Sequence, residues 1–261
     1  MLVAPRTDYP PVGLLYVADA LEQAGYGVHL FKSDMEHCEF ISTLLELDPL
    51  FVGFSVHTYP SLTEMIVLSK LTHNLGYKVV WGGNHPTCLP AECYAEEYID
   101  EVVIGDAETQ IFSMARSIAN NAPYWRNDLS CVTDLDAYKP AWHLVKLENY
   151  LYPASHSVRG GGDGAQRIFY YLMTSRGCPY SCAFCYNSRL PKQPWRAHSA
   201  AWVMDQVAYL KRELDIDGIG FWDDFFLGDR RRAVAILGYL KAQGIRFLCE
   251  ARASDLDAHF V

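Results

Sequence analysis

The sequence predicts an α/β protein in which a doubly wound, five-stranded parallel sheet is followed by further βα units. Strand-like and helix-like segments alternate through the first half at the spacing of βαβ units. The segment Leu50–Val56 is almost entirely apolar, as expected for a strand buried between two layers of helices. The alternation stops near residue 120 and resumes near residue 166, and 261 residues exceed the usual size of one domain. Two domains are therefore expected.

The elements of the first domain, residues 1–120, follow from the hydrophobic period and from glycine positions. Apolar side chains recur on one helical face from Leu14 to Leu21, and Gly25 ends that helix. Gly76 lies just past the helix Ser61–Leu75, where glycine adopts a left-handed cap easily. In chain order the predicted elements are strand Leu2–Ala4, helix Leu14–Leu21, strand Val28–Phe31, helix Ile41–Leu47, strand Leu50–Val56, helix Ser61–Leu75, strands Val79–Trp81 and Glu101–Ile104, and helix Thr109–Ile118.

Three loops should meet at the carboxyl edge of this sheet, where doubly wound sheets bind their ligands. They are Ser55–Pro60, Gly82–Thr87 and Gly105–Glu108; all three are small and polar, and the last two contain glycine. Glycine lets the backbone approach a bulky planar ligand, and the Ser, Thr and Asn side chains can hydrogen-bond to amides. Most sheets of this class have glycine-rich loops, so the residues alone leave a specific ligand open.

Residues 121–165 are predicted to be a linker, because they show no clear hydrophobic period. The glycine run Gly160–Gly162 could cradle a phosphate, but no helix start follows it, which favours a flexible turn. The second domain, residues 166–261, resumes the alternation. Its predicted elements are strand Ile168–Met173, helix Ala200–Leu214, strand Gly218–Trp222, helix Arg231–Gln243 and strand Ile245–Glu250.

Three cysteines stand close together in Cys178-Pro-Tyr-Ser-Cys182-Ala-Phe-Cys185, shortly after the strand Ile168–Met173. Thiolates this near in sequence can converge on one metal centre without long-range folding. A structural zinc site needs four protein ligands, and no second Cys-x-x-Cys or paired histidine follows. A [4Fe-4S] cluster held by three cysteines keeps one iron open. Zinc and unligated buried thiols are the alternatives.

The pattern Cys-x-x-x-Cys-x-aromatic-Cys, filled here by Cys178, Cys182, Phe184 and Cys185, resembles the signature of the radical S-adenosylmethionine (SAM) enzymes. The resemblance implies that the three cysteines ligate a [4Fe-4S] cluster whose open iron chelates SAM. It further implies that an electron from the cluster cleaves SAM to a 5′-deoxyadenosyl radical, with a reductant such as flavodoxin or ferredoxin as partner.

Tyr9-Pro10-Pro11-Val12-Gly13-Leu14, Gly82-Gly83-x-His85 and Gly105-Asp106-x-Glu108 precede the cysteines in that order. Together they resemble the cobalamin-binding domain of the cobalamin-dependent radical SAM class, which includes methyltransferases and the anaerobic magnesium-protoporphyrin ester cyclase. The resemblance implies a cobalamin site formed by Tyr9, Ser55, His57, Thr58, Gly82, Gly83, His85, Gly105 and Glu108.

Two departures from the family patterns bear on that site. The Asp-x-His-x-x-Gly sequence that places a histidine under cobalt in many cobalamin proteins is missing, so cobalamin without a protein imidazole ligand is expected. His57 and His85 are the nearest candidates for such a ligand, but a lone loop histidine is more often a hydrogen-bonding group. Asp106 stands where the class more usually has glutamate.

The predicted second domain carries polar residues at the carboxyl ends of its strands, where βα barrels place their active sites. In the family, polar residues after the second strand receive the amino group of SAM, and Asp223 and Asp224 match that region. A helix N-cap is the alternative for one of the two. Arg252, after the third strand, could bind the SAM carboxylate or the substrate, and Phe184 is expected to contact SAM.

Only about three βα units fit into residues 166–261, whereas the family's barrel has six. The sequence therefore predicts an incomplete radical SAM βα barrel with an exposed strand edge, which is a liability in an isolated chain. A fragment, or half of a split protein, is the expected interpretation.

Composition restricts the class of partner. A net charge of −9 and a pI near 5.4 argue against a general binder of nucleic acid or of an anionic membrane. No apolar run of membrane-spanning length and no signal sequence is present. Eight cysteines are too dilute for a disulfide scaffold, and three of them stand in a redox-labile motif, which points to a reducing cytoplasm. The expected partner is a small-molecule substrate, with no nucleic acid and no membrane.

The function implied by the resemblance is that of a cobalamin-dependent radical SAM enzyme, with methyl transfer to an unactivated carbon as the first hypothesis. A radical cyclisation or rearrangement is the second. A non-catalytic cobalamin-binding or redox-sensing module is the alternative from another class. The substrate is not legible from these residues.

Overall fold

The computed structural model describes residues 1–33, 36–122, 124, 129–153, 167–185, 187 and 194–256. The chain divides into two compact units. The first consists mainly of Met1–Val132 together with Tyr138–Leu144, and the second contains Thr133–Ala137 and most residues from Val145 onward.

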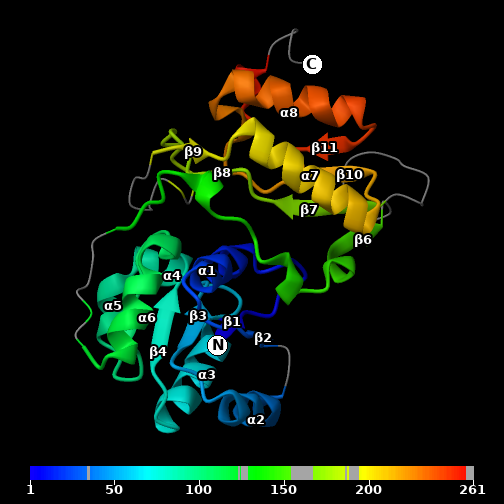
Figure 1. Cartoon of the computed structure of the whole chain (residues 1–261). Coiled ribbons are helices and arrows are strands. Elements are labelled where there is room, and N and C mark those ends of the chain that lie inside the picture. Colours follow the sequence, from blue (N-terminus) through cyan, green and yellow to red (C-terminus); the bar gives the residue numbers. More distant parts are fainter. Residues whose placement is uncertain are drawn as a thin grey trace. The chain divides into compact units, whose positions relative to one another are not determined.

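The first unit contains a five-stranded sheet in the order β2-β1-β3-β4-β5 (Figure 1). All four strand pairs are parallel, which confirms the predicted sheet. Its elements are β1 (Leu2–Ala4), α1 (Val12–Gln23), β2 (Leu30–Lys32), α2 (His37–Leu47), β3 (Val52–Ser55), α3 (Leu62–Asn74), β4 (Val79–Gly82), α4 (Asn84–Cys88), α5 (Pro90–Tyr94), β5 (Glu101–Val102), the 3₁₀ turn η1 (Ala107–Thr109) and α6 (Ile111–Ala119).

Alternate side chains of the strands enter two separate cores, because successive residues of a strand point to opposite faces. Val3 of β1 packs in a cluster that includes Phe40 of α2 and Met65 of α3. Its neighbours Leu2 and Ala4 pack in a second cluster with residues of α1 and α6. Both faces of the sheet are therefore covered by helices, which explains why most residues of these short strands are apolar.

Two short helices of the first unit were not expected from the sequence. α4 follows Gly83 directly, and α5 begins with Pro90 at its first helical position, where the missing N–H of proline costs nothing. Each has five residues, which is too short to show a helical period. Strands β2, β3 and β5 are also shorter than predicted, and β5 covers two residues instead of four.

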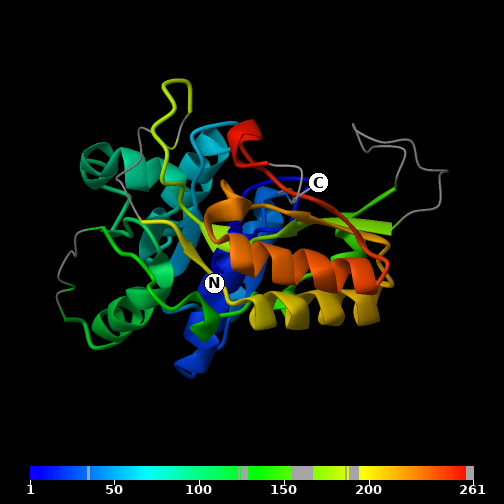
Figure 2. The same cartoon turned by 90° about the horizontal axis from the view of Figure 1, so that it is seen from above.

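The second unit has a four-stranded sheet in the order β11-β10-β7-β6. Strands β7 (Arg167–Leu172), β10 (Gly218–Phe221) and β11 (Arg246–Leu248) are parallel. Helices α7 (Ala200–Leu214) and α8 (Arg230–Ala242) connect them and pack side by side (Figures 1 and 2). Three parallel strands with intervening helices agree with the predicted start of a βα barrel, and closure of a barrel stays a prediction.

Strand β6 (Leu151–Pro153) lies inside the segment that was predicted to be a linker. It pairs antiparallel with β7 through Leu151 and Phe169, so this part of 121–165 belongs to a sheet. Three residues are too few for a recognisable alternation, and the ladder partner is supplied from elsewhere in the chain. The domain limits at residues 120 and 166 stay a prediction, and the glycine run Gly160–Gly162 lies outside the described residues.

Two further strands flank the cysteine stretch in the sequence. β8 (Ser175–Arg176) and β9 (Arg196–Ala197) form a two-stranded antiparallel ladder. Short 3₁₀ turns complete the described chain: η2 (Leu135–Ala137), η3 (Trp142–Leu144), η4 (Leu147–Tyr150), η7 (Phe226–Gly228) and η8 (Ala253–Asp255). None of the helices that the structure describes combines the length and apolar character needed to cross a membrane.

We predict that Ser69→Ala lowers the free energy of unfolding of the first unit by about 1–3 kcal/mol. The buried indole Nε1–H of Trp81 donates to Ser69 Oγ at 2.8 Å, and the substitution leaves that donor without an acceptor. Chemical denaturation followed by circular dichroism measures the change. Ser42→Ala on the exposed side of α2 is the matched control, with a change within about 0.5 kcal/mol. Equal losses in both variants would contradict this view.

Candidate functional site

The predicted ligand loops of the first unit meet at one edge, because β1, β3, β4 and β5 run parallel and end on the same side. The structure brings Thr58, after β3, to His85, in α4 after β4. Thr58 Oγ1 and His85 Nδ1 are 3.0 Å apart, within hydrogen-bonding distance. The His85 ring is buried, and it lies edge-on to Trp81 with 6.2 Å between the ring centroids. Two predicted site residues are thus in contact.

Gly83 has a backbone conformation that requires glycine. Its φ is 100° and its ψ is −167°, a region that other residues almost never adopt. A Cβ atom at this position would lie 3.0 Å from Val56 O and 3.1 Å from Val56 N. The glycine therefore lets the start of α4 lie directly against the end of β3. Because glycine has no side chain, it also leaves space at this edge for a bulky planar group.

Thr87, which the sequence did not single out, joins two of the candidate ligand loops. Its Oγ1 donates to Gly83 O at 2.8 Å and accepts from Gly105 N at 3.1 Å, so it ties the loop after β4 to the loop after β5. Gly105 has a φ of 84°, another position that favours glycine. The signal in the sequence was its place at the end of the Gly82–Thr87 loop.

The other predicted cobalamin residues of this unit have varied surroundings. Glu108 is buried in η1, and Ser55 and Gly82 end strands β3 and β4. Burial lowers the pKa of His57 and raises the pKa of Tyr9. Asp106, the departure from the family pattern, uses its carboxylate to accept the backbone N–H of Val132 at 2.8 Å.

The three cysteines of the second unit lie in one loop that follows β8. Gly177 opens this loop with a φ of 79°. Cys178, Cys182 and Cys185 are half-buried, and the N–H of Cys185 donates to Cys182 O at 3.0 Å in a tight turn. Within the described residues, no group of three His, Cys, Asp or Glu side chains is arranged to hold a metal ion. The donor set, three accessible thiols on one short loop, nevertheless fits iron–sulfur ligation.

Phe184, between the second and third cysteines, is 94% exposed. A large aromatic ring in water is available to cover a bound group, in agreement with the predicted contact to SAM, which stays a prediction. Burial raises the pKa of another thiol of this unit, Cys249 after β11, to about 11.

The two adjacent aspartates after β10 have different roles. Asp223 is buried, and its carboxylate accepts three hydrogen bonds from Thr174 and Ser175, so it is not free to receive the amino group of SAM. The expectation for Asp223 is withdrawn for this reason. Asp224 is exposed and remains a candidate. The alternative that either residue caps the next helix is wrong, since Asp229 Oδ1 accepts the N–H of Arg232 at the start of α8.

Arg252 contacts the cysteine loop. Its guanidinium carbon lies 3.8 Å from the ring centroid of Tyr180, a cation–π geometry that joins the segment after β11 to the loop. Tyr180 in turn meets Phe225 edge-on, with 5.1 Å between the ring centroids. The sequence indicated Arg252 but not its partner, although Tyr180 lies inside the cysteine motif.

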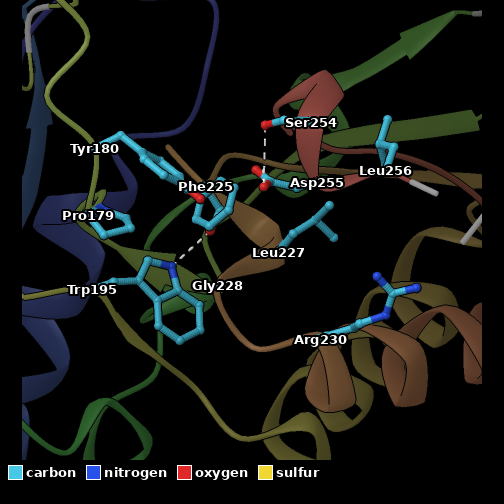
Figure 3. Close-up of a pocket in the computed structure, with 10 residues that line it drawn as sticks. All are labelled: Pro179, Tyr180, Trp195, Phe225, Leu227, Gly228, Arg230, Ser254, Asp255 and Leu256. Atoms are coloured by element: carbon cyan, nitrogen blue, oxygen red, sulfur yellow. Dashed lines mark hydrogen bonds between the residues drawn. The ribbon is translucent and has the colours of Figure 1, made fainter.

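A cavity of about 490 Å³ lies beside the cysteine loop (Figure 3). Its wall is largely aromatic and aliphatic, and the indole N–H of Trp195 donates to Phe225 O at 2.8 Å. The charged side chains of the lining are those of Arg230 and Asp255, both drawn in Figure 3. The lining residues are Pro179, Tyr180, Trp195, Phe225, Leu227, Gly228, Arg230, Ser254, Asp255 and Leu256. Such a cavity suits a small ligand with a flat apolar part and a few polar groups.

Comparison with known proteins defines the class to which these features point. Residues 1–111 match the family model of the B12 binding domain. The chain as a whole resembles the cobalamin-dependent radical SAM enzymes in sequence and in fold, which confirms the resemblance inferred from the motifs.

Particular relatives are methyltransferases and a cyclase. An uncharacterised methyltransferase of Pyrococcus horikoshii is 26% identical over 92% of this chain and 54% of its own length. The anaerobic magnesium-protoporphyrin IX monomethyl ester cyclase of Synechocystis is 26% identical over 80% of this chain and 44% of its own length. The chain thus spans about half the length of these curated relatives.

Two solved structures share the fold. One is the cobalamin-dependent radical enzyme OxsB with aqua-cobalamin and SAM bound, with a TM-score of 0.71, 17% identity and coverage of 94% of this chain and 38% of that one. The other is the radical methyltransferase TsrM of Kitasatospora setae with cobalamin and a [4Fe-4S] cluster bound, with a TM-score of 0.71, 17% identity and coverage of 99% and 55%.

We predict that Gly83→Ala lowers the stability of the first unit by about 1–3 kcal/mol, because alanine cannot adopt this backbone conformation without strain. The shift of the denaturation midpoint measures the loss. Gly82→Ala is the matched neighbour, since a Cβ there meets only Val103 Cβ at 3.8 Å. A loss as large in Gly82→Ala as in Gly83→Ala would show that backbone conformation at Gly83 is not the constraint.

Proposed function

We propose that this chain is part of a cobalamin-dependent radical SAM enzyme that transfers a methyl group to an unactivated carbon of a small-molecule substrate. The observation that carries the proposal is the pairing of two features in one chain. A B12 binding domain occupies residues 1–111, and a loop with three accessible cysteines follows the first parallel strand of the second unit.

The first unit would bind cobalamin at its carboxyl edge. Gly83 and Gly105 let the backbone lie close to the corrin, while the contact between Thr58 and His85 fixes two polar groups at the same edge. Burial in that contact supports the view that His85 is a hydrogen-bonding group. The other residues proposed for this site are Tyr9, Ser55, His57, Gly82 and Glu108.

The second unit would hold the [4Fe-4S] cluster through Cys178, Cys182 and Cys185. Three thiolates leave one of four irons without a protein ligand, and SAM is the group that would occupy it. Phe184 is placed to cover SAM, and Asp224 is the exposed carboxylate available for its amino group. Arg252, already held over Tyr180, is available for its carboxylate.

When bound, the cluster and SAM supply a 5′-deoxyadenosyl radical and cobalamin supplies a methyl carrier, so the cofactors perform the difficult chemistry. The share of this chain is to bind these groups, to orient them and to keep water from them. A small-molecule substrate and a reductant such as flavodoxin or ferredoxin belong to the proposal.

A radical cyclisation is the second candidate function. It is favoured by one specific observation, the 26% identity to the anaerobic magnesium-protoporphyrin IX monomethyl ester cyclase of Synechocystis. Methyl transfer is preferred because several other relatives are methyltransferases, among them the hopanoid C-3 methylase of Methylococcus capsulatus.

Anaerobic reconstitution with iron, sulfide and hydroxocobalamin tests the proposal. We expect about four irons and one cobalt per chain, since three cysteines suit a four-iron cluster and the first unit suits one cobalamin. Metal analysis and the visible spectrum are the measurements. The triple variant Cys178→Ala, Cys182→Ala and Cys185→Ala should lose the iron and keep the cobalt.

Each metal reports on a different unit. Iron without cobalt would reject the cobalamin site, and cobalt without iron would reject the cluster. Iron that persists in the triple variant would show that the metal is held elsewhere.

A further inference from the structure

Four buried polar side chains lie in, or directly beside, the segment that leads into the cysteine loop. Thr174, Ser175, Asp223 and Arg232, which we call the loop anchor, are each at most 8% exposed. Buried polar groups cost free energy unless hydrogen bonds compensate them. The hydrogen bonds that compensate the loop anchor also show which part of the chain it fixes.

Asp223, just after β10, binds the segment from one side. Its Oδ1 accepts the backbone N–H of Thr174 at 2.6 Å, and its Oδ2 accepts the hydroxyl of Thr174 at 2.5 Å and that of Ser175 at 2.7 Å. Burial raises the pKa of this carboxyl, while the three donors and the nearby Arg232 oppose the shift. Hydrogen bonds to a carboxylate are about twice as strong as neutral ones.

Arg232, in the first turn of α8, binds the same segment from the other side. Its Nη2 donates to Thr174 O at 2.8 Å, and its Nε donates to His198 O at 2.6 Å. Thr174 O also accepts the backbone N–H of His198 at 3.0 Å. Thr174 is therefore fixed at its amide, its hydroxyl and its carbonyl.

His198 connects the anchor to the chain that leaves the loop. Burial lowers its pKa to about 3, so the ring is neutral at pH 7. Its Nδ1 faces Asp136 Oδ1 at 3.2 Å, and its ring stacks on Trp202 with 3.5 Å between the centroids. His198, the residue that follows β9, is thus held by its ring contacts with Asp136 and Trp202 and by backbone hydrogen bonds with Thr174 and Arg232.

The two arms of the cysteine loop are joined to each other as well. In the β8–β9 ladder, Ser175 pairs with Ala197 and Arg176 pairs with Arg196. The chain that enters the loop and the chain that leaves it are therefore fixed side by side, and residues 177–195 run between them. Fixing both ends of a loop in advance removes much of the entropy that would oppose a single arrangement of its side chains.

We propose that Asp223 and Arg232 are positioning residues for the iron–sulfur site, acting through Thr174 to fix the base of the cysteine loop. The inference rests on the proposed function, because it presumes that the loop binds a cluster. Cys178 is four residues beyond Thr174 and follows Gly177, so a fixed Thr174 sets the starting point from which the three thiols reach one cluster.

A pair of substitutions at Thr174 separates this role from simple packing. Thr174→Val keeps the shape and removes the hydroxyl donor, whereas Thr174→Ser keeps the donor and removes a methyl group. In the anaerobically reconstituted full chain, we expect Thr174→Val to lose iron to the chelator bathophenanthroline about tenfold faster than wild type. Thr174→Ser should stay within about twofold. The proposal would be overturned if Thr174→Ser lost iron as fast as Thr174→Val, or if neither variant differed from wild type.

Asp223→Asn tests the anchor without any metal. Amide hydrogen exchange of residues 173–178 in the iron-free chain should become about tenfold faster, because asparagine turns one of its amide donors toward a donor of Thr174 or Ser175. Asp217→Asn is the matched control at the other end of β10, where Asp217 Oδ2 accepts only the N–H of Arg167 at 3.1 Å among the described residues. Exchange at 173–178 should be unchanged in Asp217→Asn.

These readouts keep the two proposals apart. A wild-type chain that binds no iron would reject the cluster, and faster exchange in Asp223→Asn would then still support an anchor for the loop. Exchange that is equal in Asp223→Asn and wild type would reject the anchor even where iron is bound. Should Asp223→Asn fail to fold, the Thr174 pair decides the question.

Discussion

Parallel strands buried on both faces leave little room for polar side chains, and this constraint determines where the chemistry of this chain can lie. In the first unit both faces of the sheet carry apolar cores, so His85, Thr58 and the glycine loops can stand only at the carboxyl edge. In the second unit all four residues of β10 are buried, and polar groups begin directly after its end. Asp223 and Asp224 occupy that position, while the cysteine loop follows β8 of the same unit.

Much of the fold was predictable because long elements carry a strong period. α7 has the predicted bounds Ala200–Leu214, and Ser199 caps it by accepting the N–H of Trp202. Several elements of three to five residues were missed, since they hold too few side chains to show a period. α4, α5 and β6 belong to this group, and β6 exists only because β7 supplies its ladder.

The candidate site was predictable in its residue types more than in its contacts. The spacing of the cysteines and the glycine motifs identified both proposed cofactor sites. Sequence could not tell which of two adjacent aspartates points inward, because neighbouring residues in extended chain face opposite ways. Asp223 holds Thr174, while Asp224 is exposed. The contact of Arg252 with Tyr180 depends on two distant segments, so no local pattern could reveal it.

The most direct test of the central claim is the electron paramagnetic resonance spectrum of the reduced, reconstituted chain with and without SAM. Three cysteine ligands leave one iron open, so the account predicts that SAM changes the g values of the cluster. A spectrum that stays the same at saturating SAM, in a sample with full iron content, would contradict the claim that the three-cysteine loop holds a cluster with an open iron.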